Sequence, residues 1–96
     1  MIQYVIEALD YTDSEGLSRR MAMREKHLAG AAALKINGQF ILGGAKLSKA
    51  GKMIGSTLIL QFPTEADFDA YYAQEPYITG KVWNKIKVYK FRVATI

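Results

Sequence analysis

Three side chains that can bind an anion or transfer a proton recur along one segment with helical periodicity. Arg20, Arg24 and His27 stand at i, i+4 and i+7, and at about 100° per residue they share one face of a helix. Imidazole titrates near neutral pH and can act as an acid or a base, while guanidinium groups hold anions. This spacing predicts a pocket for a small acidic molecule, with His27 as its acid or base.

A purely structural interpretation of the same face stays open. The helix also carries an apolar stripe, made of Leu17, Met21, Leu28 and Ala32. Arg24 falls inside this stripe, and an arginine on a core-facing surface is rarely buried unless it is paired. In that case Arg24 pairs with an internal carboxylate, and His27 is a hydrogen-bonded residue at the edge of the core.

A carboxylate beside His27 could orient its ring. Glu75 stands out because it precedes Pro76 in a turn that ends a helix, where we expect side chains to be displayed rather than packed. A solvated turn residue would show the same pattern, so that alternative stays open. The other candidates are Glu7, Asp10, Glu65, Asp67 and Asp69.

Further residues could complete the walls of such a pocket. Ser56 follows Gly55 inside an apolar strand, where glycine often marks the close approach of a ligand or another backbone. Ser56 could therefore bond a ligand, or it could simply fill space. Tyr77 and Trp83 flank the turn after Glu75 and are expected to pack, although they could also wall a pocket.

Composition excludes several kinds of site. The 96 residues contain no cysteine and one histidine, which excludes disulfides, thiolate sites and a multi-histidine metal site within the chain. A net charge of +4 permits an anionic ligand, but no dense basic stripe predicts nucleic-acid binding. No apolar run approaches the roughly 20 residues of a membrane helix. We therefore expect one cytoplasmic domain over residues 1–96, with no metal, cofactor, nucleic acid or membrane.

Hydrophobic patterns and turn residues predict the strands and the first helix. Strands are expected at Ile2–Leu9, Gln39–Ala45, Met53–Phe62 and Lys85–Val93. Thr12 and Glu15 have capping-box spacing, so a helix is expected to begin there and to run to about Ile36. Asn37–Gly38 ends it, because both residues tolerate the left-handed conformation of a helix end.

A second helix is expected from Thr64, which has capping spacing to Asp67. Its buried face is expected to consist of Phe68, Tyr71 and Tyr72. The resulting order, β-α-β-β-α-β, is that of ferredoxin-like α+β domains, in which two helices cover one face of a four-stranded antiparallel sheet.

One face of such a sheet has no helix to cover it. Met53–Phe62 carries apolar side chains on both faces, which indicates that the bare face is also buried. Two sheets packed face to face with twofold symmetry would bury it, so we expect a homodimer through this surface.

Several short motifs, taken together, resemble the YCII-related proteins. They are the Tyr4-Val5-Ile6 strand, the Arg20-x-x-x-Arg24-x-x-His27-Leu28 run, Gly43-Gly44, Gly55-Ser56-Thr57, and Glu75-Pro76-Tyr77 followed by Trp83. The resemblance covers nearly the whole chain. It implies a ferredoxin-like fold that dimerises into an α+β barrel, with a pocket in which the helix histidine and a turn carboxylate form a catalytic pair.

Carried over to this sequence, the implied pair is His27 and Glu75, with Arg24 and Ser56 nearby. The family usually has aspartate where Glu75 stands. The extra methylene of glutamate moves the carboxylate by roughly a bond length, and catalytic geometry is sensitive to displacements of about 1 Å. The family also often has proline at the position of Glu25, so this helix is expected to run straighter.

Two functions fit these observations. In the first, the chain is a small lyase or isomerase acting on a hydroxylated, aromatic or acidic metabolite, with His27 moving a proton and Glu75 orienting the ring. The residues expected to contact the substrate are Arg20, Arg24, Ser56 and Tyr77. In the second, the same pocket holds a small anion without turnover, in an accessory or sensor module. A purely structural dimer is a weaker third possibility.

Overall fold

The alternation of side chains along the first strand decides which face of the sheet becomes the core. In the computed structural model, which describes residues 1–96, β1 (Ile2–Asp10) buries Tyr4, Ile6 and Ala8 on one face. Successive side chains of a strand point to opposite faces. The residues between these three therefore point to the other side of the sheet.

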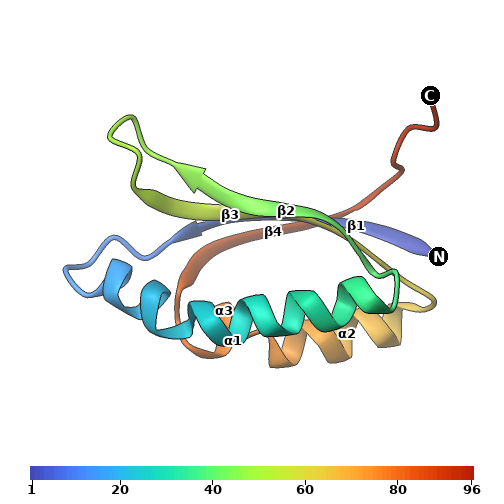
Figure 1. Ribbon diagram of the computed structural model, residues 1–96, viewed down its shortest axis with the longest axis horizontal. Helices are drawn as coiled ribbons and strands as arrows, with labels where there is room; N and C mark the ends of the chain where they lie inside the picture. Colours follow the sequence, from blue (N-terminus) through green and yellow to red (C-terminus); the bar gives the residue numbers. More distant parts are fainter.

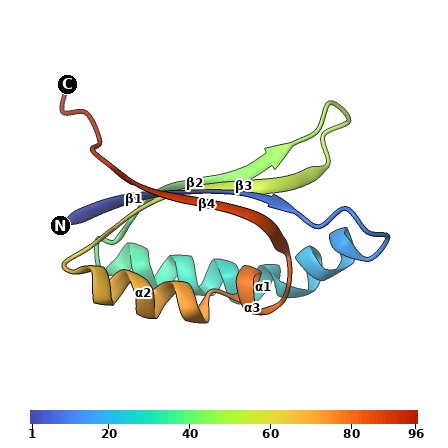
Figure 2. The same ribbon diagram turned by 180° about the vertical axis from the view of Figure 1, so that it is seen from behind.

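Four strands and three helices build the chain. They are β1 (Ile2–Asp10), α1 (Gly16–Ile36), β2 (Phe40–Leu47), β3 (Met53–Phe62), α2 (Glu65–Gln74), α3 (Pro76–Thr79) and β4 (Trp83–Phe91). The strands form one antiparallel sheet in the order β2-β3-β1-β4. The helices cover one face of this sheet and leave the other bare (Figure 1, Figure 2). The predicted ferredoxin-like arrangement is confirmed, with the short helix α3 in place of the turn expected after Glu75.

The first helix begins later than its capping motif predicts. α1 starts at Gly16, and Glu15 occupies the N-cap position without a capping side-chain bond. The Asp13 carboxylate instead organises the preceding loop, because it accepts hydrogen bonds from the Glu15 N–H at 3.3 Å and from Arg19 at 2.8 and 2.9 Å. The predicted start at Thr12 is therefore wrong, whereas every strand lies within two residues of its predicted range.

The predicted apolar stripe of α1 is also wrong. Its residues, Leu17, Met21, Leu28 and Ala32, are all exposed. The side chains turned toward the sheet instead include Arg20, Met23 and His27. The hydrophobic pattern did not predict this face because Arg20 and His27 are polar. Both are buried because they have hydrogen-bond partners on distant segments of the chain. Neither α1 nor any other helix is long and apolar enough to cross a membrane.

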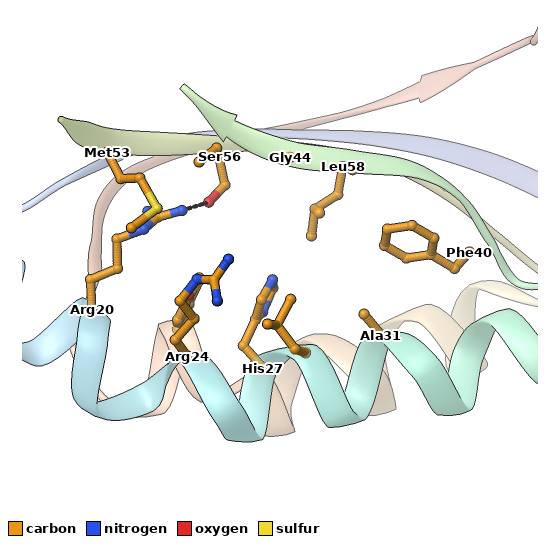
Figure 3. A pocket seen from close by; sticks show the side chains of 13 residues that line it. Arg20, Arg24, His27, Ala31, Phe40, Gly44, Met53, Ser56 and Leu58 are labelled. Carbon is orange, nitrogen blue, oxygen red and sulfur yellow. Dashed lines mark hydrogen bonds between the residues drawn. The ribbon is translucent and has the colours of Figure 1, made fainter. Parts of the chain in front are cut away.

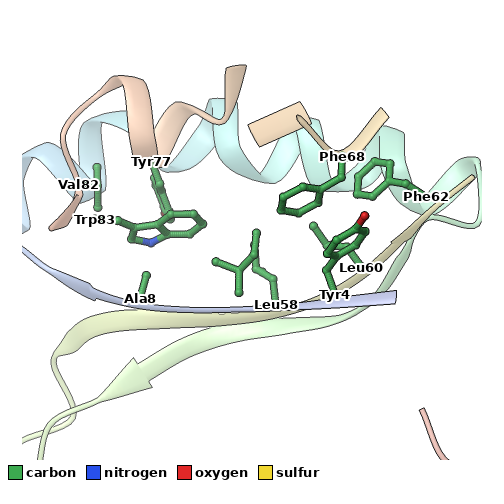
Figure 4. Close-up of a cluster of buried hydrophobic side chains, with 10 residues drawn as sticks. Tyr4, Ala8, Leu58, Leu60, Phe62, Phe68, Tyr77, Val82 and Trp83 are labelled. Atoms are coloured by element: carbon green, nitrogen blue, oxygen red, sulfur yellow. The ribbon is translucent and has the colours of Figure 1, made fainter. Parts of the chain in front are cut away.

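The hydrophobic core fills the space between the sheet and the helices (Figure 4). Tyr4 of β1 stacks on Phe68 of α2, with ring centroids 4.1 Å apart and planes 18° from parallel. Tyr71 and Tyr72 are partly buried and pack against the same cluster. The predicted buried face of α2 is therefore confirmed.

The bare face of the sheet carries apolar side chains from several strands. Paired residues of neighbouring strands lie on the same face, and the register places Leu42 opposite Ile59 and Val5 opposite Tyr89. Leu42 is 63% exposed in the isolated chain, and Tyr89 and Phe91 are also exposed. This surface is the one that was expected to contact a partner.

Candidate functional site

A pocket of about 210 Å³ opens between α1 and the strands β2 and β3 (Figure 3). Its polar end is lined by Arg20, Arg24, His27, Ser56 and Tyr77, the residues that the sequence marked as candidates. Its other end is apolar and is lined by Ala31, Phe40 and Leu58. The fold thus brings residues from α1, β2, β3 and α3 around one amphipathic space.

His27 contacts Glu75 directly. The distance from His27 Nδ1 to Glu75 Oε1 is 2.6 Å, and both side chains are buried. An ionised carboxylate can only accept, so Nδ1 donates, and in the neutral ring Nε2 is then the unprotonated nitrogen. Nε2 has no hydrogen-bond partner within the chain. Because His27 lines the pocket, the Nε2 lone pair is available to a ligand there.

The local sequence explains how Glu75 reaches this position. α2 begins as predicted, with the Thr64 hydroxyl accepting from the Asp67 N–H at 3.1 Å. Glu75 ends α2 and is also the N-cap of α3, where Pro76 occupies the first turn and the Tyr77 N–H donates to Oε1 at 3.1 Å. This cap turns the carboxylate inward, so Glu75 is only 4% exposed and is not displayed to solvent as expected.

Three donors keep the Glu75 carboxylate ionised. Oε1 accepts from His27 and from the Tyr77 N–H, and Oε2 accepts from the Tyr71 hydroxyl at 2.6 Å. Burial acts to raise the pKa of Glu75, but the hydrogen bonds and the adjacent imidazole outweigh it and hold this pKa below its ordinary value. The carboxylate can therefore orient and stabilise an imidazolium at His27.

Two aromatic rings pack around His27. The Tyr77 ring stacks on the imidazole, and the Trp83 ring meets it edge-on with centroids 6.1 Å apart. Burial raises the pKa of the Tyr77 phenol, so this ring stays neutral beside the pocket. The imidazole plane is held by packing as well as by Glu75.

Arg20 is part of a buried polar network. Its guanidinium donates to both oxygens of Asp10 at 2.9 Å and to the Ser56 hydroxyl at 2.9 Å, and it is 3% exposed. Trp83 Nε1 donates to the same hydroxyl at 3.1 Å. Burial raises the pKa of Asp10 while Arg20 opposes this effect. The ion pair at 2.9 Å places Asp10 as the counter-charge of Arg20. The Ser56 oxygen already accepts two bonds but keeps its own O–H to donate.

Arg24 differs from Arg20 because it has no carboxylate partner. It lines the pocket, is exposed, and makes no ion pair or hydrogen bond within the chain. The internal pairing that was considered for Arg24 is thus made by Arg20 instead. Arg24 is the uncompensated cation of the pocket.

Sequence reasoning did not single out the apolar lining residues Ala31, Phe40 and Leu58, and it missed the contacts of two polar residues beside the pocket. Asp10 was considered as a partner for His27, but it binds Arg20. Tyr71 was assigned only to the core, although its position four residues before Glu75 on a helix is the signal that could have revealed the contact. No group of three or more His, Cys, Asp or Glu side chains is arranged to hold a metal ion.

Comparison with known proteins agrees with this architecture. The model of the YCII-related domain matches residues 2–92. The chain belongs to the YCII-related family. An uncharacterised protein of Haemophilus influenzae is 32% identical over 93% of this chain and 95% of its own length. The YCII-related protein YciI of Escherichia coli is 30% identical over the same shares.

Solved structures share the same fold. A 5-chloro-2-hydroxyhydroquinone dehydrochlorinase from Burkholderia phenoliruptrix, in complex with 2,5-dihydroxybenzoquinone, superposes with a TM-score of 0.81 at 21% identity, covering 96% of this chain and 95% of that one. A dimeric ferredoxin-like protein of unknown function from Jannaschia superposes with a TM-score of 0.60 at 15% identity, covering 97% and 100%. At these identities the likeness concerns the fold.

Proposed function

We propose that this YCII-related chain is a small enzyme of the lyase or isomerase type, which moves a proton on a small hydroxylated or acidic metabolite. The observation that carries the proposal is the buried contact of 2.6 Å between His27 Nδ1 and Glu75 Oε1. It leaves Nε2 as a base on the pocket wall. A histidine oriented by a buried carboxylate is the usual arrangement for general acid–base catalysis.

The proposed step uses each polar group in turn. Nε2 of His27 takes a proton from a hydroxyl or an acidic C–H of the substrate, and the Glu75 carboxylate stabilises the imidazolium that forms. The Arg24 guanidinium holds an anionic or ionising oxygen of the substrate, and the Ser56 hydroxyl donates to a neighbouring oxygen. In an isomerisation His27 returns the proton at another atom of the substrate. In an elimination the electron pair left on the substrate expels a leaving group such as chloride, and His27 releases the proton to solvent.

The two ends of the pocket indicate the substrate class. Oxygen substituents would lie at the polar end near Arg24, and a flat hydrocarbon edge would contact Phe40 and Leu58. A small ring with several hydroxyl or carbonyl oxygens has this polarity. The dihydroxybenzoquinone bound by the dehydrochlorinase neighbour is such a molecule.

The test uses the neighbour's compounds as probes. The protein is incubated with 5-chloro-2-hydroxyhydroquinone and chloride release is followed; loss of HCl from this compound yields a hydroxybenzoquinone and requires no oxidant. We expect release by the wild type and its loss in His27→Gln. Affinity for 2,5-dihydroxybenzoquinone is measured in parallel.

These measurements separate the enzyme from the non-catalytic alternative. Binding that depends on Arg24, without turnover of chlorinated or unchlorinated hydroxyquinols, would favour an anion-binding or sensor module. That function requires the cation but not the Nε2 base. No binding and no turnover of any such ring would contradict both functions.

We further propose that the chain forms a homodimer through the bare face of the sheet. Exposed apolar side chains such as Leu42, Tyr89 and Phe91 support this surface, and the Jannaschia neighbour is described as dimeric. Sedimentation equilibrium should give twice the chain mass, and Leu42→Lys should shift the equilibrium to monomer. A wild type that stays monomeric at high concentration would contradict the proposal.

A further inference from the structure

The Tyr71 hydroxyl binds the half of the Glu75 carboxylate that His27 does not contact. It donates to Oε2 at 2.6 Å, whereas His27 contacts Oε1. An O–H···O⁻ bond of this length is charge-assisted and stronger than a neutral hydrogen bond. Tyr71 lies on α2, one turn before Glu75, and does not line the pocket. Its hydrogen bond to Glu75 is therefore its direct polar link to the site.

We propose that Tyr71 is a positioning residue, which holds the Glu75 carboxylate in the orientation that fixes the His27 tautomer. The inference rests on the proposed function for its catalytic meaning. A glutamate has one more rotatable bond than an aspartate, so its carboxylate requires more restraint to keep one oxygen against Nδ1. Bonds on both oxygens supply that restraint, from His27 and the Tyr77 N–H on one side and from Tyr71 on the other.

The protonation states agree with this role. Burial and the adjacent carboxylate raise the pKa of Tyr71 far above its ordinary value, so the phenol keeps its proton and remains a donor. The bond from Tyr71 is also one of the contacts that lower the pKa of Glu75. Without it, a buried carboxylate oxygen would lose its only partner, and the protonated form of Glu75 would be favoured.

The test exploits the fact that His27 is the only histidine in the chain. Imidazole ¹⁵N spectra of the intact protein then report one ring, and ¹³C spectra of the glutamate carboxyls, assigned with Glu75→Gln, report the titration of Glu75. Tyr71→Phe should raise the Glu75 midpoint by about one pH unit, the shift expected for losing a hydrogen bond to a charged group. It should also increase the fraction of the Nε2–H tautomer of His27.

Tyr72→Phe is the matched control. It removes the hydroxyl of the next residue of α2, which packs against the core. Tyr72 bonds to Glu75 through its backbone carbonyl, which accepts from the Glu75 N–H at 3.4 Å, so the substitution leaves that bond in place. We expect its spectra to match those of the wild type. If Tyr71→Phe gave the wild-type midpoint and tautomer as well, the inference would be overturned.

Two further measurements distinguish a failure of this inference from a failure of the proposed function. If Tyr71→Phe fails to fold, the ¹³Cζ signal of Tyr71 in the wild type decides: a signal that shifts as Glu75 titrates supports the inference, and a signal that does not respond to that titration overturns it. If the spectra of Tyr71→Phe change as expected but the wild type releases no chloride, the Tyr71 inference is supported and the proposed reaction is contradicted. With turnover, Tyr71→Phe should lower kcat about tenfold and leave KM unchanged.

Discussion

The Tyr77 ring lies flat against the His27 imidazole, with centroids 3.9 Å apart and planes 7° from parallel. The Arg20 guanidinium also lies over the Tyr77 ring, 4.9 Å from its centroid. Tyr77 therefore couples the His27–Glu75 pair to the buried network of Arg20. The ring is 1% exposed, so its packing contributes to stability as well as to the orientation of the histidine.

Replacing this ring should destabilise the protein and release His27. Tyr77→Leu removes the stacking and part of the buried area, and we expect the free energy of unfolding to fall by about 2 kcal/mol. Tyr77→Phe keeps the ring and should stay within about 1 kcal/mol of the wild type. Urea unfolding measures both. Equal stability of the leucine and phenylalanine variants would show that the stack contributes nothing.

The two arginines of the pocket should respond differently to the same substitution. Arg20→Gln leaves the buried Asp10 carboxylate without its cation and should cost about 3 kcal/mol of unfolding free energy. Arg24→Gln removes an unpaired, exposed cation and should change stability by less than about 0.5 kcal/mol. It should nevertheless weaken binding of 2,5-dihydroxybenzoquinone about tenfold, the effect of roughly one charge-assisted hydrogen bond.

Urea unfolding and titration calorimetry separate these effects. A large loss of stability in Arg24→Gln would mean that Arg24 has a structural partner after all. Unchanged affinity in the same variant would remove it from the binding site.

The contribution of Glu75 to stability should depend on pH with a definite sign. Its pKa in the folded protein is lowered from an ordinary value of 4.5, so the folded state favours the ionised form. This contribution is fully present above the ordinary pKa and is lost as the pH falls through the folded pKa. The stability difference between wild type and Glu75→Gln should therefore shrink below about pH 4.5.

Urea unfolding at a series of pH values measures this difference. Subtracting the two curves removes the contributions of other groups with shifted pKa values, such as Asp10, whose pKa is raised, and Asp13, whose pKa Arg19 lowers to about 2. A difference that grows as the pH falls would contradict the ionised, hydrogen-bonded state of Glu75.

A methyl group at Gly43 should reduce the apolar end of the pocket. A Cβ there would lie 2.6 Å from both Phe40 Cζ and Leu58 Cδ2, so these side chains would have to move. We expect Gly43→Ala to weaken binding of the dihydroxybenzoquinone probe. At Gly44 a Cβ meets nothing within 4 Å, so Gly44→Ala is the matched control and should bind nearly as the wild type does. Equal affinities would show that Phe40 and Leu58 do not limit the ligand.

Much of the fold could be predicted because its signals are local. Strand boundaries follow alternation and turn residues, and the second helix begins where Thr64 and Asp67 form a cap. The same kind of signal misled at the first helix, where Asp13 bonds to Arg19 rather than allowing a cap at Thr12. A capping motif competes with other local hydrogen bonds, and here Arg19, six residues beyond Asp13, takes the carboxylate.

The polar residues of the site could be predicted from the sequence, but the partner that each of them binds could not. The spacing of Arg20, Arg24 and His27 placed them on one helix, and Glu75 stood out beside a proline. The sequence did not show which arginine is neutralised, because Arg20 and Arg24 have the same side chain and differ only in what the sheet presents to them. Their catalytic and binding roles remain a proposal.

By itself, the sequence determined the order of the elements, the ferredoxin-like class and a short set of polar residues able to do acid–base chemistry. The tertiary structure alone decided that Glu75 is buried against His27, a residue 48 positions away, and that Asp10 takes Arg20 and leaves Arg24 free. Local propensities reflect interactions within a few residues, whereas these pairings depend on the end of α2 and the end of β1 meeting α1 in space. Burial then makes each pairing obligatory, because an unpaired charge in the interior is too costly to keep.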